Sequence, residues 1–183
     1  MPCEPESFRP LEDAISTSFI PSLLGRSVTP RERKLLALPA RHGGLGITDP
    51  TANCKSDFSS SLALSGPLID LIRGQENAFD PSSLKKSQQS IRKELKAKSN
   101  ILDQTRLEEV LSGASDKLKL AIKCATEKGA SSWVTARPLE DHQTVLHKGD
   151  FRDAIFLRYL WTPNGLPSLC SCGNHFSTEH SLS

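Results

Sequence analysis

The chain has 183 residues and a formal net charge of +2; hydrophobic residues make up 37% of it and aromatic residues 5%. This length suits one domain, or one domain with an extension. Typical domains contain roughly 45–50% apolar residues when glycine is counted, so we expect partly extended helices whose surfaces contact other molecules. The small net charge excludes a uniformly basic protein, and any affinity for nucleic acid must come from a local patch.

The N-terminal residues 1–6 lack the basic start and apolar run of a signal peptide. No apolar stretch approaches the roughly 20 residues of a membrane-spanning helix. The sequence therefore predicts an intracellular protein, in the nucleus or cytoplasm, with no membrane partner. Five scattered cysteines without a secretory signal do not indicate a disulfide framework. Two of them, Cys54 and Cys124, lie in helical patterns and are predicted to be small core residues.

Apolar residues at helical spacing predict a first helix over residues 8–25. Pro21 should end or kink this helix, and Gly25 is a plausible C-terminal stop. Residues 29–32 read Thr-Pro-Arg-Glu, which is a capping box with proline in the first helical position. A short helix should follow and end by Pro39.

Residues 43–46 read Gly-Gly-Leu-Gly and predict a tight turn. A phosphate could bind where such a loop precedes a helix, but the loop lacks the Lys-Ser/Thr of a P-loop and a preceding strand. A structural turn is therefore the favoured interpretation. Asp49 is the expected N-cap of the next helix, which should stop at Gly66-Pro67, with a second piece over residues 68–72.

The longest predicted helix begins after Asp80-Pro81, spans residues 84–111 with apolar spacings of seven and four, and ends at Gly113. Further helices are expected over residues 118–124 and 149–160, joined by a packed loop with a short helix. No stretch predicts a strand convincingly. The predicted fold class is mainly α: an irregular helical bundle with one long basic helix and a small Cys/His-containing C-terminal tail. Core packing is the expected role of Trp133, Tyr159 and Trp161.

The long helix carries a run of cations in which Glu94 is the only acid. A helix would place them on a basic face beside the apolar stripe, where they could follow the phosphates of RNA or DNA. The alternative, a solvated helix surface, is favoured when the residues are considered alone. The candidate nucleic-acid-binding residues are Lys85, Lys86, Arg92, Lys93, Lys96 and Lys98.

A cluster of cysteines and histidines lies at the C-terminal end of the chain. A structural zinc site takes four nitrogen or sulfur ligands in a tetrahedron. Cys170 and Cys172 could bind one side of the ion from a tight turn, with His180 as a third ligand. His175 is the local candidate for the fourth, but it lies too close to Cys172 to reach the ion without distortion. The sequence thus predicts an incomplete zinc site with weak or no zinc retention; the alternative is an exposed tail with two thiols.

Residues 38–47 read Leu-Pro-Ala-Arg-His-Gly-Gly-Leu-Gly-Ile. They resemble the LP…GGLGI segment that follows the catalytic domain of non-LTR (LINE-type) retrotransposon reverse transcriptases, where it lies in the thumb. Residues 19–25 resemble the element just before it. Residues 129–163 resemble a region of retrotransposon proteins that leads into a CxCG…F…H…C knuckle. The residues that match this knuckle are Cys170, Cys172, Gly173, Phe176 and His180.

This resemblance runs from about residue 19 to the end of the chain and implies four segments. They are a thumb-like helical region (1–80), a linker with the long basic helix and the following helix (81–128), a helical connector (129–168) and an incomplete zinc-knuckle-like tail (169–183). The family's fourth zinc ligand, a cysteine, would follow Ser183. Its polymerase aspartate pair would lie upstream, and its nuclease downstream.

The resemblance therefore implies a non-catalytic fragment that binds template or target nucleic acid and joins a polymerase segment to a nuclease segment. A second hypothesis is a helical protein–protein interaction module that uses the Leu84–Leu111 stripe to bind a partner helix. A third, a small zinc-dependent enzyme, needs an open metal position beside a general base, and the sequence indicates neither.

Overall fold

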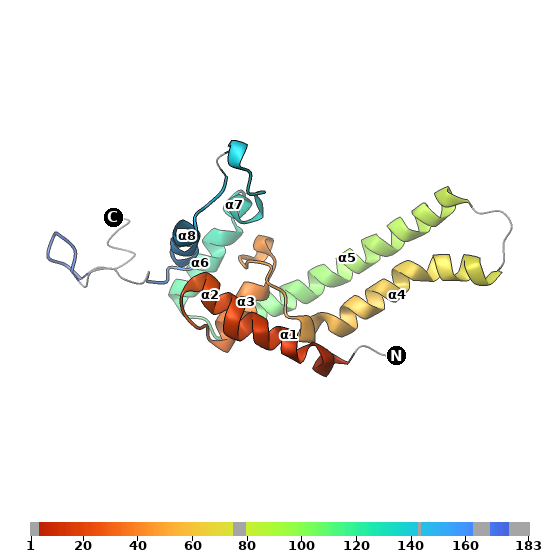
Figure 1. Ribbon diagram of the computed structural model, residues 1–183, viewed down its shortest axis with the longest axis horizontal. Coiled ribbons are helices and arrows are strands. Elements are labelled where there is room, and N and C mark those ends of the chain that lie inside the picture. Colours follow the sequence, from red (N-terminus) through yellow and green to blue (C-terminus); the bar gives the residue numbers. More distant parts are fainter. Residues whose placement is uncertain (1–3, 75–79, 143, 163–168, 176–183) are drawn as a thin grey trace.

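A computed structural model of the chain describes residues 4–74, 80–142, 144–162 and 169–175. The predicted mainly α class is confirmed, and α4 and α5 project together from a group formed by the shorter helices (Figure 1). In the described residues the only strand-like pairing is an isolated antiparallel bridge between Leu169 and His175. The helices are α1 (Arg9–Ala14), α2 (Ile20–Leu24), α3 (Pro30–Ala37), α4 (Pro50–Gly74), α5 (Pro81–Ser112), α6 (Asp116–Thr126), α7 (Ser132–Thr135) and α8 (Lys148–Arg158).

One hydrophobic core joins helices from both ends of the chain. α2 packs against α8, α3 against α5, and α6 against α8. Trp133 and Trp161 pack at the edge of this core, and Tyr159 is buried in it, which confirms that these aromatic side chains serve packing. The buried core residues are Ile20, Leu24, Leu35, Leu36, Leu38, Val110, Ile122, Ile155, Phe156 and Tyr159.

Pro21 does not end the first helical stretch. The chain makes a π-helical turn over Ile15–Phe19, in which Ile20 donates its N–H to the carbonyl of Ile15, and then continues as α2. Proline lacks an N–H and its ring crowds the preceding turn, and a widened turn before it accommodates both effects. Gly25 ends α2 with φ of 75°, as the sequence predicted.

The capping box at the start of α3 is present. Thr29 Oγ1 accepts the Glu32 N–H at 3.2 Å, and Glu32 Oε2 accepts the Thr29 N–H at 2.7 Å. One turn later, the guanidinium of Arg33 is buried. It forms two 2.7 Å hydrogen bonds to the Glu12 carboxylate, and it also donates to the carbonyl oxygens of Ile47 and Thr48. Because an unpaired buried charge is costly, this network fixes α1, α3 and the start of α4 relative to one another.

The glycine turn folds back onto the end of α3. Gly46 donates its N–H to Leu38, and Ile47 donates its N–H to Leu36. A Cβ on Gly44 would overlap the carbonyl oxygen of Leu38, so the backbone packs more closely than any other residue allows. Gly43 has φ of 85°, and its carbonyl accepts a 2.9 Å hydrogen bond from the Tyr159 hydroxyl on the far side of the core.

The expected break at Gly66-Pro67 is wrong, because α4 is one helix from Pro50 to Gly74 with Pro67 inside it. A proline removes a backbone hydrogen bond from the turn before it. In α4 the carbonyl that loses its helical donor is that of Ala63. Gln88 of the neighbouring helix donates its Nε2 to the next carbonyl along, that of Leu64, at 3.3 Å. A contact with α5 therefore lies in the turn before Pro67, where the helix continues past a local break signal.

The long helix α5 has its predicted ends, with Asp80 as N-cap and Gly113 as C-cap. The apolar stripe at Leu84, Ile91 and Leu95 is half-buried, and α5 packs against α4. Much of the stripe is therefore used within the chain.

The prediction for the two cysteines is half correct. Cys54 is 5% exposed and belongs to the interior, whereas Cys124 is exposed. α6 turns Ala121, Ile122 and Ala125 toward the core, which leaves Cys124 on its solvent side. Within the part of the chain that the structure describes, no helix is both long and apolar enough to cross a membrane.

Replacing Gly44 with alanine is expected to lower the free energy of unfolding by more than about 2 kcal/mol, because the new Cβ would overlap backbone that cannot move away. The matched control is Gly66→Ala, where a Cβ meets open space within α4. That change should be neutral or stabilising by up to about 1 kcal/mol. Urea denaturation followed by circular dichroism measures both. Equal stability of the two variants would contradict the role given to the turn.

Tyr159, the single tyrosine of the chain, provides a pH-dependent test of the core. Burial raises its pKa to about 12, although Arg158 acts in the opposite direction. A phenol pKa that is raised by folding stabilises the protein fully below its unfolded pKa of about 10. That stability is lost, at about 1.4 kcal/mol for each pH unit, as the pH rises from about 10 to 12.

Absorbance at 295 nm, where tyrosinate absorbs, should therefore report a transition near pH 12 that coincides with unfolding. Tyr159→Phe should remove this component of the alkaline instability and lower stability at neutral pH by about 1 kcal/mol, because the Gly43 carbonyl loses its donor. A phenol that titrates near pH 10 in the folded protein would contradict the burial.

Candidate functional site

The predicted basic residues of α5 are exposed, but they do not form one face. At about 100° per residue, Lys85, Arg92 and Lys96 lie within about 40° of one another, beside the apolar stripe. Lys86 and Lys93 lie farther round the helix, on the side opposite the apolar stripe. Lys98 falls on the other flank of the stripe, so five of the six cations share one broad side of α5 and Lys98 lies apart from them.

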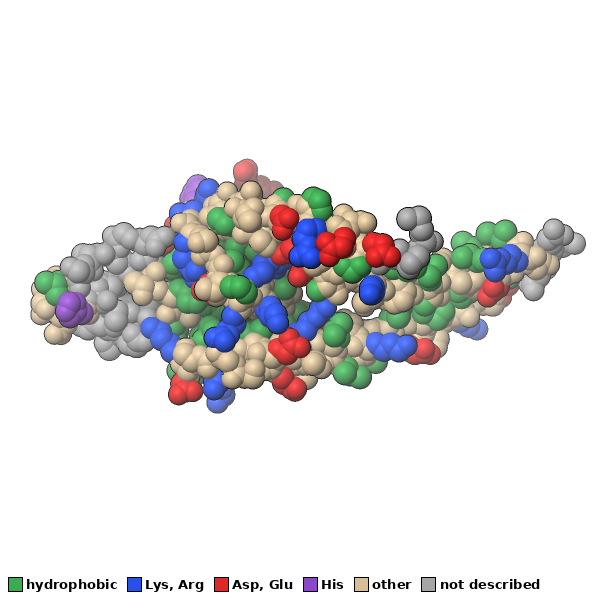
Figure 2. All heavy atoms as spheres, turned by 90° about the horizontal axis from the view of Figure 1, so that it is seen from below, with side chains coloured by type: hydrophobic (Ala, Val, Ile, Leu, Met, Phe, Trp, Pro, Cys, Tyr) green, Lys and Arg blue, Asp and Glu red, His purple; other side chains and the backbone are tan. Residues whose placement is uncertain are grey.

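None of these six side chains takes part in a hydrogen bond or ion pair with the residues that the structure describes. Lysine and arginine side chains left in water in this way remain available to an external anion. Figure 2 shows cationic side chains distributed along the projecting part of the molecule rather than gathered in one dense patch. The arrangement favours contacts with a long, repeating anion over binding of a single small one.

A trough between α4 and α5 brings together residues that the sequence analysis did not single out. Its outer part is lined by hydroxyls of α4 and α5 together with Lys96 and Lys98. It meets an inner cavity of about 270 Å³ at Leu102, which lines both. The hydroxyl-bearing residues of the outer part are Ser56, Ser59, Ser60 and Ser99. The spacing of the three serines on α4 is by itself only a weak helical pattern. The packing of α5 against α4 is what brings them together with Ser99 in one trough.

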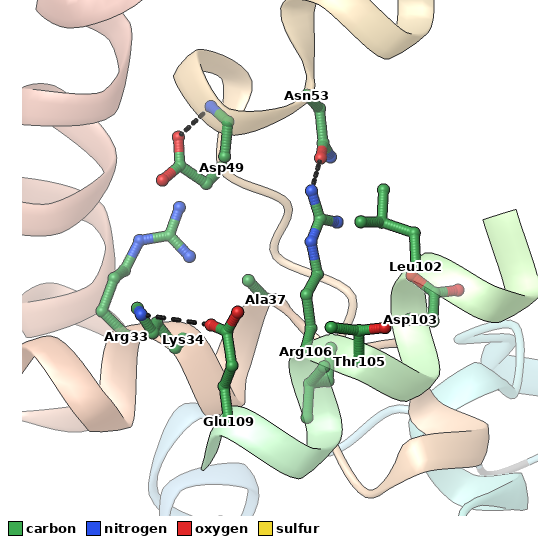
Figure 3. A pocket seen from close by; sticks show the side chains of 12 residues that line it. Arg33, Lys34, Ala37, Asp49, Asn53, Leu102, Asp103, Thr105, Arg106 and Glu109 are labelled. Atoms are coloured by element: carbon green, nitrogen blue, oxygen red, sulfur yellow. Dashed lines mark hydrogen bonds and ion pairs between the residues drawn. The ribbon is translucent and has the colours of Figure 1, made fainter.

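The inner cavity lies where α3, the start of α4 and the C-terminal part of α5 meet (Figure 3). On its wall, Lys34 Nζ lies 3.4 Å from the Glu109 carboxylate, and Arg106 donates to Asn53 Oδ1 at 2.6 Å. Asp103 is buried and binds Arg41 at 2.6 Å. Charges of both signs therefore line this cavity, which does not have the character of a purely cationic phosphate site.

Asp49 caps the start of α4 beside the cavity. Its Oδ1 accepts the N–H groups of Thr51 and Ala52 and the Thr51 hydroxyl. Burial acts to raise the pKa of Asp49, but these hydrogen bonds and the nearby charge of Arg33 together lower it below its ordinary value. The carboxylate is therefore held in its charged form as part of the structure, and it is a poor candidate for a general base.

The predicted metal ligands Cys170 and Cys172 lie on one tight turn. The backbone carbonyl of Cys170 accepts the Gly173 N–H at 2.9 Å, and the Cys170 N–H donates to the backbone carbonyl of Asn174 at 2.8 Å. Gly173 has φ of 85°. His175 pairs with Leu169 at the base of this turn. His180 lies outside the described residues. The backbone of this turn thus resembles one half of a structural zinc site, in which two sulfur ligands lie on a loop that contains glycine.

No group of three or more His, Cys, Asp or Glu side chains positioned to bind a metal ion occurs among the described residues. The two thiols fit half of a zinc site, and the identity of the other ligands stays a prediction. Zinc held here by four protein ligands would order the turn and would not supply a reaction, because such a structural site leaves no open position.

Comparison with family models, with curated proteins and with solved structures finds no match to this chain.

We expect protein purified without added metal to contain clearly less than one zinc per chain, because three of the four expected ligands do not hold the ion tightly. Inductively coupled plasma mass spectrometry of the full chain measures this, with Cys170→Ser as the matched variant. Stoichiometric zinc that is lost in Cys170→Ser would contradict the expectation. It would show that His175, water or a second chain completes the site.

Proposed function

We propose that this chain is a non-catalytic, nucleic-acid-binding segment, corresponding to the thumb and linker of a LINE-type reverse transcriptase polyprotein. The observation that carries the proposal is the long projecting helix α5, whose exposed cations have no protein partner in the described residues. The resemblance of residues 19–47 and 129–180 to retrotransposon proteins supports it.

The mechanism is electrostatic contact with a phosphate backbone. Lys85, Arg92 and Lys96 share one side of α5 over about 17 Å, at about 1.5 Å per residue. Each phosphate that such a side chain neutralises releases a counterion, which gives affinity that falls with salt and does not depend on sequence. Because the net charge is near zero, such affinity must come from a local patch, and α5 is the candidate.

In this proposal the glycine turn and the core position α5, and the segments expected before and after supply polymerase and nuclease activities. In the inner cavity Lys34 pairs with Glu109, Asp103 pairs with Arg41, and Asp49 caps a helix. Accordingly, we expect no extension of a primed RNA template by the chain itself.

The alternative is a helical protein–protein interaction module. The apolar stripe of α5 does not support it strongly, because α5 packs against α4 and Leu84, Ile91 and Leu95 are half-buried. A different observation favours it: Phe58, Leu62, Ile69 and Ile72 are exposed on α4 at spacings that place them on one helical face. An exposed apolar stripe of this kind is typical of a surface that binds another helix.

The test is a salt titration of single-stranded RNA binding by fluorescence anisotropy. The variant Lys85→Gln/Arg92→Gln/Lys96→Gln should weaken binding and reduce the slope of log K against log salt by about 2, at about 0.7 for each lost phosphate contact. The matched control removes three exposed lysines outside α5, Lys123, Lys128 and Lys148, and should leave the slope nearly unchanged.

If both triple variants lost the same amount of RNA affinity, the loss would reflect only the overall charge of the chain. That result would contradict a specific interface on α5. Binding that does not change with salt, or no binding at all, would favour the protein–protein module. In that case Leu62→Asp and Ile69→Asp should prevent association with the partner.

A further inference from the structure

The inner cavity between α3, α4 and α5 contains one arginine whose pairing differs from that of its neighbours (Figure 3). Arg33 binds the Glu12 carboxylate, and Lys34 binds that of Glu109. Arg106 donates from Nη2 to Asn53 Oδ1. Among the described residues this neutral oxygen is the only group with which the Arg106 side chain forms a hydrogen bond or ion pair.

The guanidinium of Arg106 therefore retains most of its hydrogen-bonding capacity. An arginine offers five N–H donors in a planar fork that matches the two oxygens of a carboxylate. Arg106 is half-buried, and a partly desolvated cation interacts more strongly with an anion than one in open water.

The carboxylates of the same wall have other partners. Asp103 binds Arg41, Glu109 binds Lys34, and Asp49 accepts hydrogen bonds from the start of α4. The lining charges and their partners therefore balance, because Arg106 and the Asp49 carboxylate are the two lining charges without an ion-pair partner among the described residues. An anion bound here would be held by the unused N–H donors of Arg106 rather than by an excess of positive charge. A singly charged carboxylate would meet less repulsion from the three lining carboxylates than a doubly charged phosphate.

The rest of the wall is mostly apolar, with Ala37, Leu38, Ala52 and Leu102 around the charged groups. The cavity of about 270 Å³ is slightly smaller than the roughly 300–1,000 Å³ of typical ligand pockets. It has space for a short hydrocarbon body and one charged group. We propose that this cavity binds a small aliphatic monocarboxylic acid, with its carboxylate on Arg106 and its hydrocarbon part against Ala52 and Leu102.

The probe is isovalerate, titrated into the ¹⁵N-labelled full chain and followed by NMR. We expect saturable shifts of the Arg106 Nε–H resonance and of the Ala52 and Asn53 amides. Isovaleramide has the same shape without the charge and should bind at least tenfold more weakly. Inorganic phosphate should produce no saturable shift at these positions. Because none of these three probes contains nucleic acid, the outcome is independent of the function proposed for α5.

Two variants test the site from different sides. Arg106→Gln removes the cation, and Ala52→Leu fills the cavity from an exposed helix position while leaving Arg106 in place. Each should weaken isovalerate binding at least tenfold, and Arg137→Gln, a change at an exposed arginine elsewhere, should leave it unchanged. If Arg106→Gln does not fold, Ala52→Leu still decides.

The proposal is overturned if isovaleramide binds as tightly as isovalerate, if phosphate saturates the same resonances, or if Ala52→Leu binds as well as the original chain.

Discussion

The close backbone approach at Gly44 is the constraint on which the rest of the fold depends. It allows residues 43–47 to lie against the end of α3, where Leu45, Gly46 and Ile47 donate their N–H groups to the carbonyls of Leu36 and Leu38. From this position Gly43 contacts Ile122 of α6 and accepts the Tyr159 hydroxyl hydrogen bond. One turn of the chain thus determines where α4 begins and how α3, α6 and α8 meet. A side chain at this point would separate all of them.

Two ion pairs that each include a buried side chain also fix the positions of segments that are distant in the sequence. Arg33 connects α1, α3 and residues 47–48, and Arg41 connects the glycine turn to Asp103 of α5. Such pairs contribute less to stability than their short distances suggest, because each charge loses its hydration. Their effect here is geometric, since a guanidinium with several fixed acceptors tolerates only one arrangement of the segments around it.

The α4–α5 pair separates the structural and the candidate functional parts of the molecule. Its inner faces are used for packing, with Gln88 supplying a hydrogen bond to α4 next to Pro67. Its outer faces remain exposed, cationic on α5 and apolar on part of α4. The two proposed functions use different outer faces, and for that reason one salt titration separates them. The cavity at Arg106 lies at the base of the pair and depends on neither.

The sequence by itself determined the features that depend on neighbouring residues. These are the caps at Thr29, Asp80, Gly25 and Gly113, the glycine turn and the mainly helical class, since each follows from hydrogen bonds within a few residues of chain. Only the tertiary structure decided that α4 continues through Pro67, that Cys124 is exposed and that Arg106 borders a cavity. These depend on which distant helix packs against each face, and burial by a distant segment leaves no local signal in the sequence.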